Sequence, residues 1–243
     1  MASYIKEIRN AYGFDDVAIV PGSVTLNPEL ADTSFVLGTC TFDTPFIASA
    51  MDAVVDPTFA ALMHQTGGLA VMNLEGIQTR YEDPAVALET IVSASQATVT
   101  NILQDIYTRP IDEKLIQTRV QQIKSSGSVC AVSVTPQNTK RLAPLAVEAG
   151  ADVIVVQSTV TTARHISRSY KGLVLSELIP SLKGVPLVVG NCVTYDAALE
   201  LIETGIDGLL VGVGPGAACT TREVTGVGVP QVTATLELSL IHI

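Results

Sequence analysis

Residues 128–158 read SVCAVSVTPQNTKRLAPLAVEAGADVIVVQS and contain the pattern that predicts the architecture of the chain. The apolar runs Ser128–Val134 and Asp152–Ser158 are continuous rather than alternating, which is typical of strands covered on both faces. Between them, Asn138–Ala149 has the spacing of a helix, and Gly150 follows as a helix C-cap. A strand, a helix and a second strand with short connections predict a βαβ unit of a parallel sheet.

The same unit recurs on both sides of this stretch. Four more apolar runs rich in Val, Ile and Leu are Pro45–Ala50, Gly68–Leu74, Pro186–Asn191 and Gly208–Val213. Helix-like stretches lie between the runs, notably Ile111–Ser126 and Thr194–Glu203, and Gly67, Gly127 and Gly205 follow such stretches as C-caps. Six units fit either an open doubly wound sheet or part of an eight-stranded barrel, and periodicity does not choose between them.

Composition excludes several classes of protein. With 47% hydrophobic residues in 243, the chain can bury a sizeable core, which excludes wholesale disorder. The formal net charge of −10 argues against a nucleic-acid partner, because phosphates need a basic surface. No apolar run is long enough to predict a membrane span. Four cysteines without CxxC spacing predict no disulfide framework, so we expect a reduced, cytoplasmic protein.

Small polar residues gather where the predicted strands end, which is where parallel α/β sheets bind ligands. Polar residues also favour ordinary loops, so each taken singly is equally well a site residue or a loop residue. In strand order the candidates are Ser49, Met51, Asp52, Asn73, Glu75, Ser133, Thr135, Gln157, Ser158, Thr159, Asn191 and Thr194.

The loop after the sixth run is the sharpest feature, and residues 212–222 read GVGPGAACTTR. Three glycines at a spacing of two expose backbone groups, and Cys219 follows them. A thiol in such a loop, near Arg222, is predicted to have a lowered pKa and to act as a nucleophile. Cys130 and Cys192 lie inside apolar runs and are predicted to be small buried residues. The loop also matches the dinucleotide pattern G-x-G-x-x-A, but Pro215 and its late position in the chain argue against a Rossmann turn.

This loop, with Gly226-Val227-Gly228-Val229-Pro230-Gln231 after it, resembles the catalytic-cysteine loop of the IMP dehydrogenase/GMP reductase family. Pro45–Asp52 resembles the family's first-strand motif, and Gly190–Thr194 its fifth-strand motif. The resemblance implies a (β/α)8 TIM barrel of which about six of the eight units are present. It continues to about Glu237, so we expect a barrel domain over residues 1–237 and an atypical tail over 238–243, with the chain ending early.

The resemblance implies a role for each matching residue. Cys219 would attack C2 of a purine nucleotide, and Thr221 would be the hydroxyl that assists. Ser49, Met51, Asn191 and Gly216 would contact the nucleotide, IMP or GMP. Gln157, Ser158, Gly212 and Gly214 would lie on the side of the cofactor, NAD or NADP. The backbone carbonyls of Gly214, Gly216 and Cys219 would hold a potassium ion (K+).

Two departures leave alternatives open. The family usually has Ser where this chain has Ala217, and Asp where it has Gln157. We therefore expect an IMP dehydrogenase-like enzyme of guanine nucleotide biosynthesis, with a GMP reductase or a non-catalytic nucleotide-binding subunit as alternatives. Gly76–Pro110 is too short for the regulatory CBS pair of many members. The family implies a homotetramer, and six strands cannot close the barrel, so we expect this chain alone to be inactive.

Overall fold

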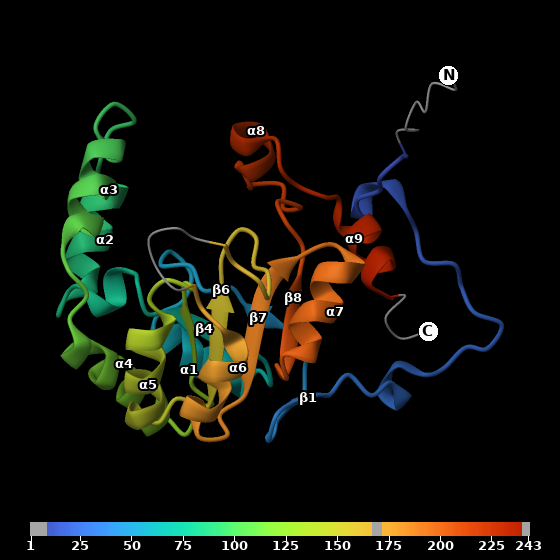
Figure 1. Ribbon diagram of the computed structural model, residues 1–243, viewed down its shortest axis with the longest axis horizontal. Coiled ribbons are helices and arrows are strands. Elements are labelled where there is room, and N and C mark those ends of the chain that lie inside the picture. Colours follow the sequence, from blue (N-terminus) through green and yellow to red (C-terminus); the bar gives the residue numbers. More distant parts are fainter. Residues whose placement is uncertain (1–8, 167–171, 240–243) are drawn as a thin grey trace.

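The computed structural model describes residues 9–166 and 172–239 and contains a six-stranded parallel sheet (Figure 1). The strands follow one another in chain order, from β3 to β8, as they do in a (β/α) barrel and not in a doubly wound sheet. All six predicted runs are confirmed as strands, and all but β7 are shorter than the apolar run that predicted them. They are β3 (Ile47–Ala48), β4 (Leu69–Asn73), β5 (Ala131–Val134), β6 (Val153–Gln157), β7 (Leu187–Cys192) and β8 (Gly208–Val211).

Helices connect the strands and cover the outer face of the sheet. The side chains of Asp56 and Asp112 accept N–H groups at the starts of α1 and α4, and Gly150 ends α5 in the left-handed region, with φ +102°. The connecting elements are α1 (Pro57–Gln65), α4 (Glu113–Ser125), α5 (Thr139–Ala149), α6 (Leu175–Leu178), η4 (Ile179–Leu182) and α7 (Tyr195–Glu203). The three predicted helical stretches are thus confirmed as α4, α5 and α7.

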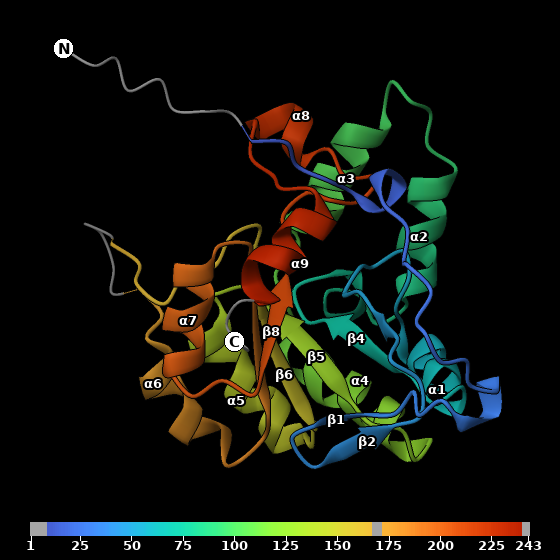
Figure 2. The same ribbon diagram turned by 90° about the vertical axis from the view of Figure 1, so that its right-hand side faces the viewer.

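Residues of β4 to β8 alternate between two apolar clusters. Val132 of β5 and Ile154 of β6 pack outward with the helices, whereas Ala131 and Val153 face the concave side. On that side a hairpin of β1 (Phe35–Leu37) and β2 (Cys40–Phe42) packs against the strands, near their amino-terminal ends in Figure 2. Phe42 is buried and its ring stacks on Phe35, with centroids 4.8 Å apart. The hairpin therefore covers the base of the sheet.

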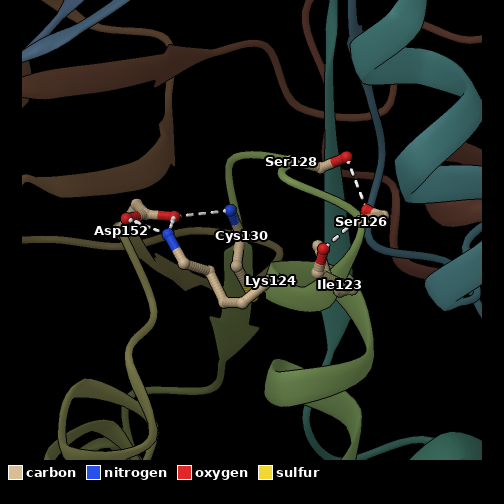
Figure 3. A network of polar contacts seen from close by, with 6 residues as sticks. All are labelled: Ile123, Lys124, Ser126, Ser128, Cys130 and Asp152. Atoms are coloured by element: carbon tan, nitrogen blue, oxygen red, sulfur yellow. Dashed lines mark hydrogen bonds and ion pairs between the residues drawn. The ribbon is translucent and has the colours of Figure 1, made fainter.

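The amino-terminal end of the sheet is fixed by a polar network (Figure 3). The carboxylate of Asp152 accepts hydrogen bonds from Nζ of Lys124 at 2.7 Å and from the backbone N–H of Cys130 at 2.8 Å. The hydroxyl of Ser126 donates to the carbonyl of Ile123 at 2.7 Å and lies 2.8 Å from that of Ser128. These contacts join the end of α4 to the starts of β5 and β6. Cys130, beside them, is buried, as predicted.

Two segments project from the sheet. Between β4 and β5, η3 (Ile77–Thr79) leads into a helical hairpin of α2 (Pro84–Val92) and α3 (Val99–Thr108), at the left of Figure 1. After β8 come α8 (Thr221–Thr225) and α9 (Gln231–Ser239).

Leu238 and Ser239, which were expected in the atypical tail, continue α9. The other tail residues, 240–243, lie outside the described residues. The amino-terminal segment adds the short turns η1 (Phe14–Asp16) and η2 (Pro28–Leu30). No helix within the described ranges has the length and apolarity needed to cross a membrane.

Candidate active site

A cavity of about 410 Å³ lies at the carboxyl ends of the strands. Ten of the residues predicted from the sequence line it: Asn73, Ser133, Thr135, Gln157, Ser158, Thr159, Asn191, Gly214, Cys219 and Thr221. Ala50 and Pro215 complete the lining. The cavity therefore joins the ends of β3 to β7 with the loop that follows β8, as the strand-end argument predicts.

The loop after β8 is held at its base and exposed at its tip. Its two arms meet at Val213 and Val229, where the N–H of Val229 donates to the carbonyl of Val213 at 3.0 Å. Nε2 of Gln231 donates to the carbonyl of Val211 at 3.1 Å. Gly212 has φ +134°, and a Cβ there would lie 2.5 Å from Oε1 of Gln231, so only glycine fits this position. Figure 1 shows that α8, which ends the loop, lies beyond the carboxyl ends of the strands.

Cys219 is an exposed thiol at the mouth of the cavity. Its Sγ lies 3.2 Å from Oγ1 of Thr221, within hydrogen-bonding distance. Hydrogen bonds from the side chain and backbone of Thr221 lower the pKa of Cys219, because they stabilise the thiolate. The predicted direction is confirmed, and so is a contribution from the backbone of the loop, whereas Arg222 is not among the causes. The aliphatic part of Arg222 lies against Gly214 and Gly228.

Asn191 comes from β7 and has a buried, unsatisfied acceptor. Its Oδ1 has no hydrogen-bond partner among the described residues. The backbone around it is fixed, since its N–H donates to the carbonyl of Ser158 at 3.2 Å and its carbonyl accepts from the N–H of Thr161 at 2.9 Å. Buried polar atoms are nearly always paired, so this oxygen points to a donor supplied by a ligand or water.

The other predicted residues are not part of the cavity lining. Ser49 and Met51 flank Ala50, which does line it, and the Met51 side chain is 54% exposed. Gly216 lies in the exposed tip of the loop, where its carbonyl accepts the N–H of Cys219 at 3.0 Å. Gly212 is buried at the base of the loop.

A second cavity, of about 450 Å³, adjoins the first and shares Thr135 and Ser158 with it. Its floor includes Glu75, whose carboxylate accepts from the N–H and hydroxyl of Thr135 and from the amide of Asn138. The opposite side comes from the segment after β6, including Thr161, His165 and Leu173. Sequence reasoning missed these last residues, because they lie four, eight and sixteen positions beyond Gln157, the last residue of β6.

Comparison with known proteins identifies the family. The family model for the IMP dehydrogenase / GMP reductase domain matches residues 11–241. The chain belongs to the IMP dehydrogenase/GMP reductase family. An uncharacterized oxidoreductase of Mycolicibacterium smegmatis is 35% identical over 235 residues, covering 94% of this chain and 62% of that protein. The inosine-5'-monophosphate dehydrogenase of Cryptosporidium parvum is 31% identical, covering 94% of this chain and 58% of its own length.

A solved structure has the same fold. The crystal structure of an IMP dehydrogenase/GMP reductase-like protein from Corynebacterium glutamicum superposes with a TM-score of 0.89 at 32% identity. The match covers 98% of this chain and 63% of that one. The chain thus spans somewhat less than two thirds of the length of these members of the IMP dehydrogenase/GMP reductase family.

Proposed function

We propose that this chain forms the nucleotide site of an NAD(P)-dependent purine-nucleotide oxidoreductase that converts IMP to XMP. One observation carries the proposal: the exposed thiol of Cys219 and the unpartnered Oδ1 of Asn191 belong to the same cavity. A nucleophile next to an unsatisfied acceptor suits a substrate with an electrophilic carbon and a hydroxyl donor, and a purine nucleotide has both.

Cys219 is proposed as the nucleophile. Its thiolate adds to C2 of IMP, and the hydride then leaves C2, so that a thioimidate joins Cys219 to the purine. Water adds to C2 and the C–S bond breaks, which releases XMP and restores the thiol. The lowered pKa of Cys219 favours the first step because a larger fraction of the thiol is ionised near neutral pH.

Thr221 is proposed to assist this cysteine. Its hydroxyl lies 3.2 Å from Sγ of Cys219 and lines the cavity. A hydroxyl at this distance stabilises the thiolate before attack and again when the C–S bond breaks. From this position it would also orient the water that attacks C2.

Nucleotide contacts are assigned to Ser49, Met51, Asn191 and Gly216. Asn191 is the best supported of these, because Oδ1 would accept a ribose hydroxyl that satisfies its buried oxygen. Met51 and Ser49 flank the cavity and would pack against the base. Ala217 cannot donate the hydrogen bond to phosphate that serine gives in the family, so the backbone N–H groups of the loop would carry more of that role.

The cofactor would lie in the adjoining cavity, on the side of Gln157 and Ser158. Ser158 lines both cavities, so the substrate and cofactor sites are continuous. When bound, NAD(P) supplies the hydride acceptor for C2. Gly214 lines the first cavity, whereas Gly212 is buried against Gln231 at the base of the loop and would act only by holding the loop in place. A potassium ion fits the donor chemistry of the carbonyls of Gly214, Gly216 and Cys219, although that of Gly216 already accepts the Cys219 N–H.

GMP reductase activity is the second candidate, favoured by Gln157. In that reaction Cys219 adds to C2 of GMP and ammonia leaves, so that a thioimidate joins Cys219 to the purine. A hydride, which NADPH would supply when bound, then adds to C2, and the C–S bond breaks to release IMP and restore the thiol. Gln157 ends β6 inside the cavity, where the family usually has a carboxylate. A neutral amide there removes the negative charge that a carboxylate would place beside the cofactor. The loss of this charge is the reason to consider GMP reduction as well as IMP oxidation.

The test is a pair of assays on the full-length protein. IMP with NAD and GMP with NADPH are followed by the absorbance of the reduced cofactor, each with and without potassium. We expect IMP oxidation, stimulated by potassium and abolished in Cys219→Ala. NADPH consumption with GMP would establish the reductase instead. Absence of turnover in both assays, together with no binding of either nucleotide, would contradict the proposal.

A further inference from the structure

The α2–α3 hairpin has a hydrophobic cluster of its own and stands apart from the sheet (Figure 1). The cluster contains Ile77, Ala87 and Ile106, with Tyr81, Leu88, Ile91 and Ile102 packed against it. None of these residues belongs to the two clusters that line the faces of the sheet. Polar contacts, those of Arg119 in α4 with the carbonyls of Gln78, Tyr81 and Glu82 among them, join the hairpin to the rest of the fold.

Tyr107, near the end of α3, makes one of these contacts. Its hydroxyl donates a hydrogen bond to Oδ2 of Asp52, a residue 55 positions earlier in the chain. The guanidinium of Arg80 lies over the Tyr107 ring, 5.8 Å from its centroid. Burial and the neighbouring Asp52 carboxylate both raise the pKa of Tyr107, so the phenol keeps its proton and remains a donor.

Asp52 connects this tyrosine to β4. Its Oδ2 also accepts the N–H of Ile77 at 3.0 Å, and its Oδ1 accepts Nδ2 of Asn73 at 3.3 Å. Space for the carboxylate exists because residue 76 is glycine: a Cβ there would lie 1.8 Å from Oδ1 of Asp52. The carboxylate is thus held by three donors, from α3, η3 and β4.

Asn73 carries the connection into the substrate cavity, which it lines. Its Nδ2 donates to Asp52, and its Oδ1 accepts the N–H of Glu75 at 2.9 Å. Both ends of the amide are therefore fixed. An asparagine amide has two N–H donors and two lone pairs, so one donor and one acceptor position remain for a ligand.

We propose that Asp52 and Tyr107 are positioning residues, which link the α2–α3 hairpin to Asn73 and orient its amide toward the nucleotide. The identity of the ligand rests on the proposed function, whereas the link itself does not. A displacement of the hairpin then alters nucleotide affinity from outside the site.

The test compares two tyrosines that each donate one hydrogen bond. Tyr107→Phe breaks the link to Asp52, whereas Tyr81→Phe removes a bond from the Tyr81 hydroxyl to the carbonyl of Ile106, inside the hairpin. Binding of IMP to the full-length protein is measured by calorimetry. We expect Tyr107→Phe to raise the Kd about three- to tenfold and Tyr81→Phe to change it less than about twofold. Equal effects of the two substitutions would overturn the proposal.

A double-mutant cycle separates positioning from general loosening. In the Asn73→Ala background, Tyr107→Phe should cause no further change in the Kd, because the group that it orients is absent. An undiminished effect in that background would show that Tyr107 acts by another route, and the proposed link would fail.

Hydrogen exchange provides a readout that needs no ligand. The amide of Glu75 donates to Asn73, so it should exchange faster in Tyr107→Phe and at the wild-type rate in Tyr81→Phe. Unchanged exchange at Glu75 in Tyr107→Phe would overturn the link. Failure of the wild-type protein to bind IMP or GMP would instead count against the proposed function, and the exchange result would still decide the link.

Discussion

The two ends of the parallel sheet use a cysteine in opposite ways. At the amino-terminal end, Cys130 is buried beside the Asp152–Lys124 pair, and burial raises its pKa to about 12. At the carboxyl end, Cys219 is exposed on a glycine loop and its pKa is lowered by Thr221. The first end holds polar contacts that join the strands, and the second holds the exposed thiol of Cys219 and the unpartnered Oδ1 of Asn191. Stability and chemistry are thus separated along the strand axis, as in other parallel barrels.

The largest difference between the two ends should appear on removing each thiol. Cys219→Ala should lower turnover of the full-length protein by at least about 10³-fold, because the covalent step is lost. Cys130→Ala should leave the turnover number of the folded protein nearly unchanged. Steady-state assays at a temperature well below unfolding measure both. Comparable losses from the two substitutions would remove the distinction between the ends.

Glycines offer a second contrast. Gly212→Ala should reduce turnover about tenfold, since the new methyl group would meet Oε1 of Gln231 and displace the base of the cysteine loop. Gly127, at the end of α4, also has a positive φ, of +78°, but its Cβ position is open. Gly127→Ala should lower the free energy of unfolding by about 1 kcal/mol without affecting turnover. Denaturant unfolding and the turnover assay are run on both variants. An equal loss of turnover in Gly127→Ala and Gly212→Ala would contradict the contrast.

Asp152 tests the amino-terminal end directly. Asp152→Ala removes the acceptor of the Cys130 N–H and the partner of Lys124, and should lower the free energy of unfolding by about 1 kcal/mol. The Glu113–Arg141 pair is half-exposed, so Glu113→Ala should change this free energy by less than about 0.5 kcal/mol. Chemical denaturation measures both values. A loss of turnover in Asp152→Ala at low temperature would contradict the separation of roles.

The smallest expected effect concerns the pH dependence of thiol modification. A lowered pKa means that Cys219 is alkylated by iodoacetamide at a lower pH than an ordinary thiol. Thr221→Val removes the side-chain hydrogen bond, so the pKa should rise and alkylation near pH 7 should slow by about threefold. Cys130, with a pKa near 12 and no exposure, should react only on unfolding. A pH profile unchanged by Thr221→Val would mean that another group sets the reactivity of Cys219.

Much of this architecture could be predicted from the sequence because both faces of a parallel strand are covered. The runs that became β4 to β8 are continuous and apolar, so their number and order could be deduced without a structure. The resemblance to the family distinguishes the barrel from the doubly wound sheet. The hydrophobic periodicity does not, because it does not depend on the order of the strands in the sheet. The three-residue strands β1 and β2 are too short to carry a recognisable pattern, and their hairpin was missed.

The cavity was predictable only in part. The strand-end rule located Asn73, Gln157 and Asn191, since each comes at or near the end of a buried run. The rule cannot show which groups pair. The sequence therefore predicted that loop amides and Arg222 lower the pKa of Cys219, whereas the structure has the hydroxyl and backbone of Thr221 in that role. The contact of Tyr107 with Asp52 joins segments on either side of a helical hairpin, and only the folded arrangement reveals it.

The most direct test of the proposed role of Cys219 is peptide mapping by mass spectrometry. The full-length protein is incubated with IMP and NAD, and in parallel with GMP, then quenched in acid and digested. We predict a purine-nucleotide adduct on the Cys219 peptide in one of the two incubations, with the Cys130 peptide of the same digest unmodified. Turnover with Cys219 unmodified, or an unmodified Cys219 in both incubations, would contradict the claim that this thiol attacks the purine.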